Sequence, residues 1–288
     1  MLPHRLRHAL GRLLGAVAFH LGLRRRVALE NLALAFPERT SVERRRIARA
    51  AYTNMAHAAL DALTSVGLSA DELDARVRLE NWEGFQQALA LGKGVLVATA
   101  HFGSWELLGE VFARRGLPLN AVVRPLKGAL NARIVQSRLE AGMKLIPPRG
   151  AISGTIQALR RSEVVAILLD QSLPGGRGIA VPFFGRPAST SPALSAAALR
   201  TGAPAFVAMA VREPEGEQLR LFLEGPIPLP HGESGAEVVE RHTAALTAVI
   251  ERYVRRYPEQ WLWLHRRWKV LPSDFRRRKG RPNSRSLV

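Results

Sequence analysis

The chain has 288 residues, of which 47% are apolar, so it can bury a substantial core as one large domain and is not disordered throughout. Its 42 basic and 24 acidic residues give a formal charge of +18, which favours anionic partners. The lack of cysteine excludes disulfides, thiolate metal sites and a cysteine nucleophile.

The first 26 residues place Arg5, Arg7 and Arg12 among leucines, a pattern that predicts an amphipathic helix lying in a membrane interface. The alternative is an ordinary helix docked on the rest of the protein. The apolar stretch from Leu13 to Leu23 is shorter than the roughly 20 residues that a spanning helix needs. Arginines rather than a cleavage site follow it, so we expect neither a transmembrane helix nor a secretory signal.

A helical part is expected over residues 27–75. Thr40 and Glu43 have the spacing of a capping box and precede a helical pattern from residue 42 to about 66.

From residue 76 to 272, short apolar runs alternate with helical patterns, which is typical of an α/β fold with a mixed, mostly parallel central sheet flanked by helices. An alternating run at 218–223 indicates an antiparallel strand at the edge of this sheet. Residues 273–288 are expected to form a basic flexible tail. Strands are expected at 94–100, 121–123, 144–146, 164–169 and 205–211, and helices at 82–91, 105–115, 128–141, 151–161, 192–201 and 236–256.

The corner from Thr99 to Glu106 follows the first of these strands directly, at the edge where open α/β sheets bind ligands. Residues five apart in one helix point about 140° away from each other, so His101 and Glu106 meet only if Gly103 forms a turn. Ser104 can then cap the next helix. We predict His101 as a general base for a hydroxyl, oriented by Glu106 and stabilised by it when protonated.

Other polar residues are expected to reach the same sheet edge and bind substrate. Asp170 and Gln171 close a second apolar strand, so they should converge with the histidine. Arg124 follows another strand, and Arg133 and Arg138 lie on the next helix, where one of these arginines is placed to hold an acidic headgroup.

Near the C-terminal end, Trp261, Trp263 and Trp268 are interleaved with basic residues. This pattern suits single-stranded nucleic acid or a membrane interface. The alternative is that Trp261 and Trp263 pack onto the core, and His265 is expected to be structural.

Taken together, these residues resemble the lysophospholipid acyltransferase superfamily and, within it, the lipid A late acyltransferases. The resemblance spans nearly everything from Arg24 to Lys269. Its motifs are Asn31-Leu-Ala-Leu-Ala-Phe-Pro-Glu38, His101-Phe-Gly-Ser-Trp-Glu106, Val123-Arg124-Pro125, Asp170-Gln171, Val181-Pro-Phe-Phe-Gly185, Thr201-Gly-Ala-Pro204 and Pro258-Glu-Gln-Trp-Leu-Trp-Leu-His-Arg-Arg-Trp-Lys269.

The resemblance implies a glycerol-3-phosphate acyltransferase-like fold that transfers a fatty acyl group to a hydroxyl of a lipid A precursor. It implies an acyl-carrier-protein or coenzyme A thioester as donor, with His101 as base and Glu106 supporting it. The family's second acidic motif corresponds to Asp170. An arginine for the acceptor's phosphate corresponds to Arg138, with Arg133 in reserve.

The same resemblance places the chain at the cytoplasmic face of the bacterial inner membrane, held peripherally or monotopically by anionic lipids. No cofactor, metal or nucleic-acid partner is expected. Two features depart from the family: Ser104 stands where an asparagine is usual, and the transmembrane helix of many members is not expected here.

Two alternatives stay open. The same residues could acylate another phospholipid or glycolipid acceptor, or the chain could be a non-enzymatic basic protein that binds nucleic acid or membranes.

Overall fold

The computed structural model describes residues 4–64, 70–123, 128–173, 176–213, 218–231 and 235–269. The predicted ligand Arg124 and the predicted tail at 273–288 lie outside these ranges. The helices are α1 (His4–His20), α2 (Arg25–Ala35), α3 (Ser41–Thr64), α4 (Ala70–Arg76), α5 (Trp82–Ala90), α6 (Trp105–Arg114), α7 (Ala129–Glu140), α8 (Ala151–Arg160), α9 (Ala193–Thr201), α10 (Ala236–Arg256) and the short 3-10 helix η2 (Pro258–Gln260). The strands are β1 (Val77–Glu80), β2 (Val95–Thr99), β3 (Leu119–Val122), β4 (Lys144–Ile146), β5 (Val164–Leu168), β6 (Ile179–Phe183), β7 (Arg186–Thr190), β8 (Ala205–Arg212) and β9 (Leu219–Glu224).

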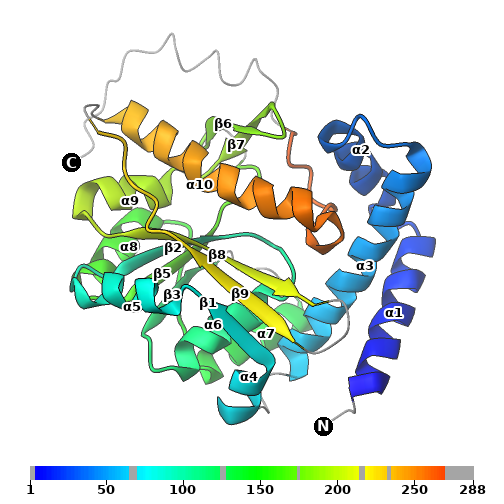
Figure 1. Cartoon of the computed structure of the whole chain (residues 1–288), viewed down its shortest axis with the longest axis horizontal. Coiled ribbons are helices and arrows are strands. Elements are labelled where there is room, and N and C mark those ends of the chain that lie inside the picture. The colour runs from blue at the N-terminus through cyan, green and yellow to red at the C-terminus, as the bar shows by residue number, and fades with distance from the viewer. Residues whose placement is uncertain are drawn as a thin grey trace.

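The central sheet has the strand order β1-β9-β8-β2-β5-β3-β4 (Figure 1). Strands β8, β2, β5, β3 and β4 are parallel, whereas β9 is antiparallel to β8 and parallel to β1. This confirms the predicted α/β fold with a mixed, mostly parallel sheet.

The predicted strand at 218–223 is antiparallel, as expected, but its predicted position at the edge is wrong. Strand β1 pairs with the outer side of β9, and Arg220 and Glu80 join the two through an ion pair of 2.9 Å. Strand β1 has only four residues, two of them charged, so its alternation of apolar and polar residues is too short to be recognised as a strand from the sequence.

Helices cover both faces of the sheet (Figure 1). Leu96 and Ala98 of β2 belong to the core beneath α8, α9 and α10, whereas Val95 and Val97 face the core beneath α5 and α6. All of β2 is buried, which is why its sequence is continuously apolar.

The N-terminal helices stand together beside the α/β part (Figure 1, blue). The predicted capping box is confirmed: the backbone N–H of Thr40 donates to Glu43 at 2.7 Å, and the N–H of Glu43 donates to Thr40 Oγ1 at 3.3 Å. Helix α3 packs against α1, α6, α7 and η2, so it connects the N-terminal part to the carboxyl edge of the sheet.

Strands β6 and β7 form a separate antiparallel hairpin that packs against α10 and was not predicted from the sequence. Val181 and Phe183 are buried, and the Phe183 ring lies 5.4 Å from that of Trp261. Trp261 and Trp263 are 2% and 0% exposed. These two indoles therefore belong to the core, in agreement with the alternative kept open above, and are not available for base stacking.

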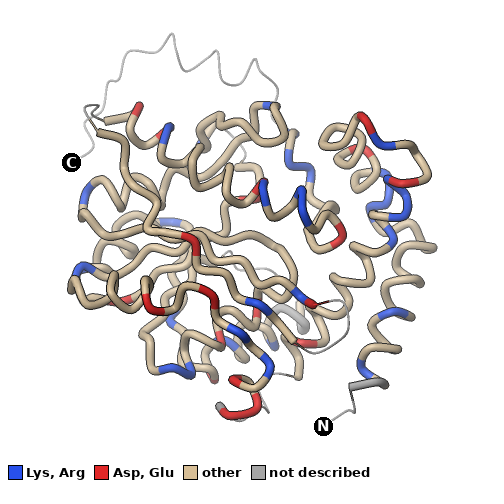
Figure 2. The backbone as a smooth tube through the Cα atoms, viewed as in Figure 1, with Lys and Arg blue, Asp and Glu red and all other residues tan. Residues whose placement is uncertain are grey.

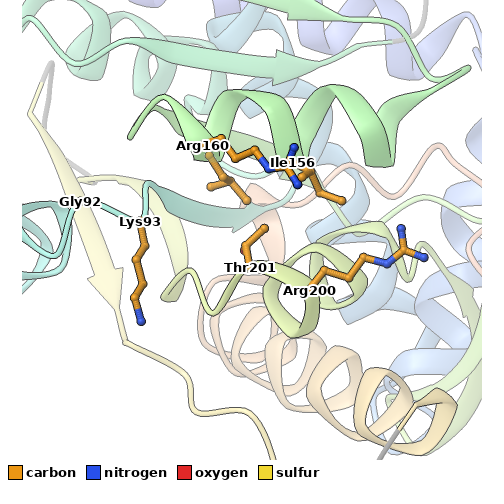
Figure 3. Close-up of a pocket in the computed structure, with 7 residues that line it drawn as sticks. Gly92, Lys93, Ile156, Arg160, Arg200 and Thr201 are labelled. Carbon is orange, nitrogen blue, oxygen red and sulfur yellow. The ribbon is translucent and has the colours of Figure 1, made fainter.

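A hollow of about 770 Å³ lies at the amino edge of the sheet, where β2, β5 and β8 begin (Figure 3). The cations on its wall, Lys93, Arg160 and Arg200, are exposed, and Figure 3 shows Lys93 and Arg200 extending in different directions. Arg160 and Arg200 lie in the last turns of α8 and α9, where a positive charge stabilises the helix end.

Within the described ranges, none of the helices is both long enough and apolar enough to cross a bilayer.

Candidate active site

The corner between β2 and α6 is shaped by Gly103, whose φ is +55°. A Cβ atom at this position would lie 1.7 Å from the carbonyl oxygen of Ala210, so only glycine fits. The predicted turn between His101 and α6 is thereby confirmed.

Ser104 stands at the predicted N-cap position of α6, but its hydroxyl does not cap the helix. It donates instead to Asp61 of α3 at 2.8 Å, and Arg212 of β8 donates to both Asp61 and Ser104. This buried cluster fixes the start of α6 against α3 and β8, because all three groups lose partners if the corner moves.

His101 is held by Asp170, which follows β5. The Nδ1 atom lies 2.9 Å from Asp170 Oδ1, and the backbone N–H of His101 donates to Oδ2 at 2.9 Å. Since the carboxylate accepts, Nδ1 carries the hydrogen and Nε2 is left to take a proton. The side chain of His101 is 21% exposed while that of Asp170 is 2% exposed, so the ring reaches the surface from a buried support.

The amide of Gln171 lies against the same ring. Its Nε2 atom is 3.3 Å from His101 Nε2 and 3.4 Å from His101 Nδ1. The structure therefore brings together His101, Asp170 and Gln171, three residues predicted from the ends of neighbouring strands.

The acid–base properties of the pair follow from these contacts. Burial lowers the pKa of His101, but the charge and hydrogen bond of Asp170, together with the charge of Glu106, outweigh burial and leave that pKa above its ordinary value. Burial raises the pKa of Asp170, but the charge of His101 and the hydrogen bonds from His101 and Trp261 outweigh it and hold that pKa below its ordinary value. The carboxylate thus stays ionised and stabilises the imidazolium.

The direct contact expected between His101 and Glu106 is not formed, because no hydrogen bond joins these side chains in the described part of the chain. Both oxygens of Glu106 accept from Arg138, with distances of 2.6 and 3.0 Å, and Oε1 also accepts from the Trp105 indole at 2.9 Å. The corner turns Glu106 toward α7, so the carboxylate that orients the imidazole is Asp170. Glu106 acts on His101 through its charge and through Trp105, whose ring is 5.4 Å from the imidazole.

The predicted arginines have different surroundings. Arg138 is 19% exposed and forms the two-pronged pair with Glu106 close to His101. Arg133 is half exposed and lies 3.6 Å from Glu140 on its own helix.

The segment after η2 forms the back wall of the site, and sequence reasoning missed this role. Trp261 donates from its indole to Asp170 Oδ2 at 2.9 Å, and the N–H of Leu262 donates to the carbonyl of His101 at 3.0 Å. Asn31 of α2 donates to the carbonyls of Trp263 and His265 at 2.7 and 2.6 Å. Two motifs at opposite ends of the chain are therefore parts of one support behind His101.

Comparison with known proteins identifies the family of the chain. The family model of the bacterial lipid A biosynthesis acyltransferases matches residues 1–270. The chain belongs to this family. It is therefore an acyltransferase.

Several relatives match this acyltransferase along most of their length. It is 29% identical over 280 residues to a lipid A biosynthesis palmitoleoyltransferase of Escherichia coli, covering 94% of this chain and 87% of the relative. It is 27% identical over 278 residues to the lipid A biosynthesis lauroyltransferase of the same organism, covering 94% and 88%. A phosphatidylinositol mannoside acyltransferase of Mycolicibacterium smegmatis is 25% identical over 195 residues, covering 66% and 62%.

Proposed function

We propose that this acyltransferase moves a fatty acyl group from a thioester of acyl carrier protein or coenzyme A to a hydroxyl of a lipid A precursor. The observation that supports it most is the placement of the partly exposed His101 on the buried carboxylate of Asp170 in a member of this family. The relatives with the fullest coverage are named for lipid A.

In the proposed reaction, His101 Nε2 takes the proton of the acceptor hydroxyl as its oxygen attacks the thioester carbonyl carbon. The tetrahedral intermediate then expels the thiolate, which takes the proton back from His101. Asp170 keeps the ring in the required tautomer throughout. No covalent acyl-enzyme is needed.

The proposed role of Arg138 is to bind a phosphate of the acceptor. Nε and one Nη of Arg138 donate to Glu106, so the other Nη remains as a donor for the phosphate. The bidentate pair also fixes the plane of the guanidinium. Glu106 thereby positions Arg138 and adds negative charge near the imidazolium. Gln171 is placed to contact the acceptor beside Nε2.

We place the enzyme on an anionic lipid surface through α1, in line with the cytoplasmic face of the inner membrane that the resemblance implies. This helix turns small residues to the protein: a Cβ at Gly15 would lie 2.5 Å from the backbone of Thr53 in α3. Phe19 of α1 is buried in the core, but Leu6, Leu13, Leu14 and Val17 are exposed, Leu13 to 61%, and Leu21, just after the helix, is 71% exposed.

More than half of the exposed large apolar side chains in the described residues lie between residues 6 and 23. Figure 2 shows no acidic residue on α1, and the first in the chain is Glu30. An apolar stripe with only positive charge around it suits anionic headgroups.

The acceptor is tested with purified protein, labelled acyl donors on acyl carrier protein and on coenzyme A, and a panel of acceptors. The panel holds a lipid A precursor, a lysophospholipid and a phosphatidylinositol mannoside. We expect transfer to the lipid A precursor to be fastest. Preferred transfer to the mannoside would favour the function named for the mycobacterial relative, and no transfer to any acceptor would overturn the proposal.

Membrane docking is tested by flotation with anionic and neutral vesicles. Replacing Leu13, Leu14 and Val17 by glutamine is expected to abolish flotation with anionic vesicles, because the apolar stripe is lost. The matched control replaces three exposed apolar residues elsewhere, Val42, Leu91 and Leu199. Equal flotation of the two triple variants would exclude α1 as the docking element.

A further inference from the structure

The imidazole of His265 contacts the segment that follows β5, at the edge of the candidate site. Its Nε2 atom accepts a hydrogen bond from the backbone N–H of Ser172 at 3.1 Å. Ser172 comes directly after Gln171, whose amide nitrogen lies 3.3 Å from His101 Nε2. A continuous series of contacts therefore joins His265, through the backbone, to the ring of the proposed base.

The hydrogen bond from Ser172 defines the protonation state of His265. A backbone N–H can only donate, so Nε2 must present its lone pair, and the hydrogen of the neutral ring is on Nδ1. A protonated ring carries a hydrogen on both nitrogens and could not accept from Ser172. His265 therefore serves as an acceptor only while it is neutral.

The surroundings of the His265 ring favour the neutral form. Burial lowers the pKa of His265, and the charge of Asp170 after β5 opposes burial. The charges of His101 after β2, Arg267 on the C-terminal segment and Arg24 before α2 lower that pKa further, so that it lies below its ordinary value. The acceptor is thus maintained at neutral pH.

The C-terminal segment holds the chain on both sides of Gln171. On one side, the Trp261 indole donates to Asp170 Oδ2 at 2.9 Å. On the other side, His265 accepts from the residue that follows. The segment is itself fixed, because Asn31 of α2 donates to the backbone carbonyl of His265 at 2.6 Å. Gln171 therefore lies between two anchored neighbours.

We propose that His265 is a positioning residue that, as a neutral acceptor, holds the amide of Gln171 against the ring of His101. The amide nitrogen is almost equidistant from the two ring nitrogens, at 3.3 and 3.4 Å, so it lies off the direction of the Nε2 lone pair. That lone pair is left to the acceptor hydroxyl. Loss of the bond from Ser172 removes one of the two anchors and releases the amide from this position.

The test replaces His265 by two side chains of similar length. His265→Gln keeps an acceptor oxygen, whereas His265→Met offers only a weak sulfur acceptor. We expect His265→Met to lower kcat/KM for acyl transfer about 10-fold, the value of one hydrogen bond lost at a partly buried donor. His265→Gln should stay within about threefold of the wild type. The control is His231→Met, the same substitution at an exposed histidine, for which no change is expected.

NMR measures the position of the amide directly. The wild type and His265→Gln should show a nuclear Overhauser effect between the Gln171 side-chain amide and the His101 ring, and His265→Met should lose it. If His265 acts through Gln171, adding His265→Met to Gln171→Met should cost little further activity. Equal kcat/KM in His265→Met and His265→Gln, or additive losses in the double variant, would overturn the inference.

Thermal unfolding identifies a variant that does not fold, and the wild-type protein then supplies the test. With nitrogen-15 labelling, a scalar coupling should be found across the hydrogen bond from the Ser172 amide to His265 Nε2 at neutral pH. It should disappear as the His265 ring takes up a proton at lower pH, because the protonated ring cannot accept. A coupling that is missing at neutral pH, or that persists after the ring is protonated, would contradict the proposed role.

This inference rests on the proposed role of His101 as a base, but the NMR measurements do not. If the amide contact depends on His265 in a protein that transfers no acyl group to any acceptor, the positioning stands and the proposed function fails. If transfer is found and His265→Met leaves it unchanged, the function stands and the role of His265 fails.

Discussion

The two ends of strand β5 each carry a buried carboxylate, and the carboxylates are satisfied differently. Glu163, before the strand, accepts hydrogen bonds from Asn120, Lys144 and Arg161 at 2.6–3.1 Å. Asp170, after the strand, accepts from Nδ1 of His101, whose side chain is 21% exposed. At the amino edge, Glu163, Lys144 and Arg161 are all in contact with an opposite charge. At the carboxyl edge, Asp170 instead contacts His101, which can exchange a proton.

The comparison teaches that a strongly perturbed carboxylate does not mark a catalytic site by itself. The hydrogen bond of Arg161 and those of Lys144 and Asn120 outweigh burial and lower the pKa of Glu163 to about 2. That is a structural ion pair with no reactive neighbour. The same holds for the hollow at the amino edge, whose exposed cations lie at helix ends and do not converge (Figure 3).

The largest difference between the two ends is expected for carboxylate-to-amide substitutions. In Asp170→Asn, the amide no longer fixes the Nδ1–H tautomer of His101, so acyl transfer should fall at least about 100-fold while the protein stays folded. Steady-state transfer and circular dichroism check this. The control is Glu163→Gln, and a similar loss of activity in both variants would remove the distinction between the edges.

A smaller loss of activity is expected when the ion pair between Glu106 and Arg138 is broken. Glu106→Gln and Arg138→Met should each lower kcat/KM by about 10- to 100-fold, the value of a charge-assisted two-pronged contact. Because the two residues act as one unit, the double variant should lose little more than the worse single variant. Additive losses would show that they act independently, and Arg160→Met at the amino edge serves as the control.

The smallest effect on activity, and a clear one on stability, is expected at the amino edge. Glu163→Gln should lower the free energy of unfolding by about 1–3 kcal/mol at pH 7 and leave transfer within about twofold. Since the folded pKa of Glu163 is about 2 and its ordinary value is 4.5, this stabilisation is present above pH 4.5 and disappears as the pH falls toward 2. Denaturant unfolding at pH 7 and pH 3 measures it, and an equal difference at both values would contradict the assignment.

The sequence predicts well whatever is local or periodic. The buried strand Val95–Thr99 is continuously apolar, Gly103 marks the turn, and Thr40 with Glu43 marks the start of α3, so the sequence alone predicts these elements. The convergence of His101 and Asp170 followed from the rule that parallel strands end at one edge.

The partners of the buried polar groups could not be predicted, because they come from distant parts of the chain. Glu106 lies near His101 in sequence, yet its oxygens bind Arg138 on another helix. Ser104 is a residue type that often caps helices, but its hydroxyl donates to Asp61 and accepts from Arg212 instead. No local pattern distinguishes the buried Arg267 from the exposed arginine beside it.

The central claim, that His101 on Asp170 is the base, is tested most directly by comparing two pKa values in the wild-type enzyme. One is the pKa of the His101 ring from NMR, and the other is the acidic limb of kcat/KM for acyl transfer, which reports the essential base of the free enzyme. We predict that the two coincide, above the ordinary histidine value of 6.5, with kcat/KM rising as the ring loses its proton. A rate that stays constant while the ring titrates would contradict the account.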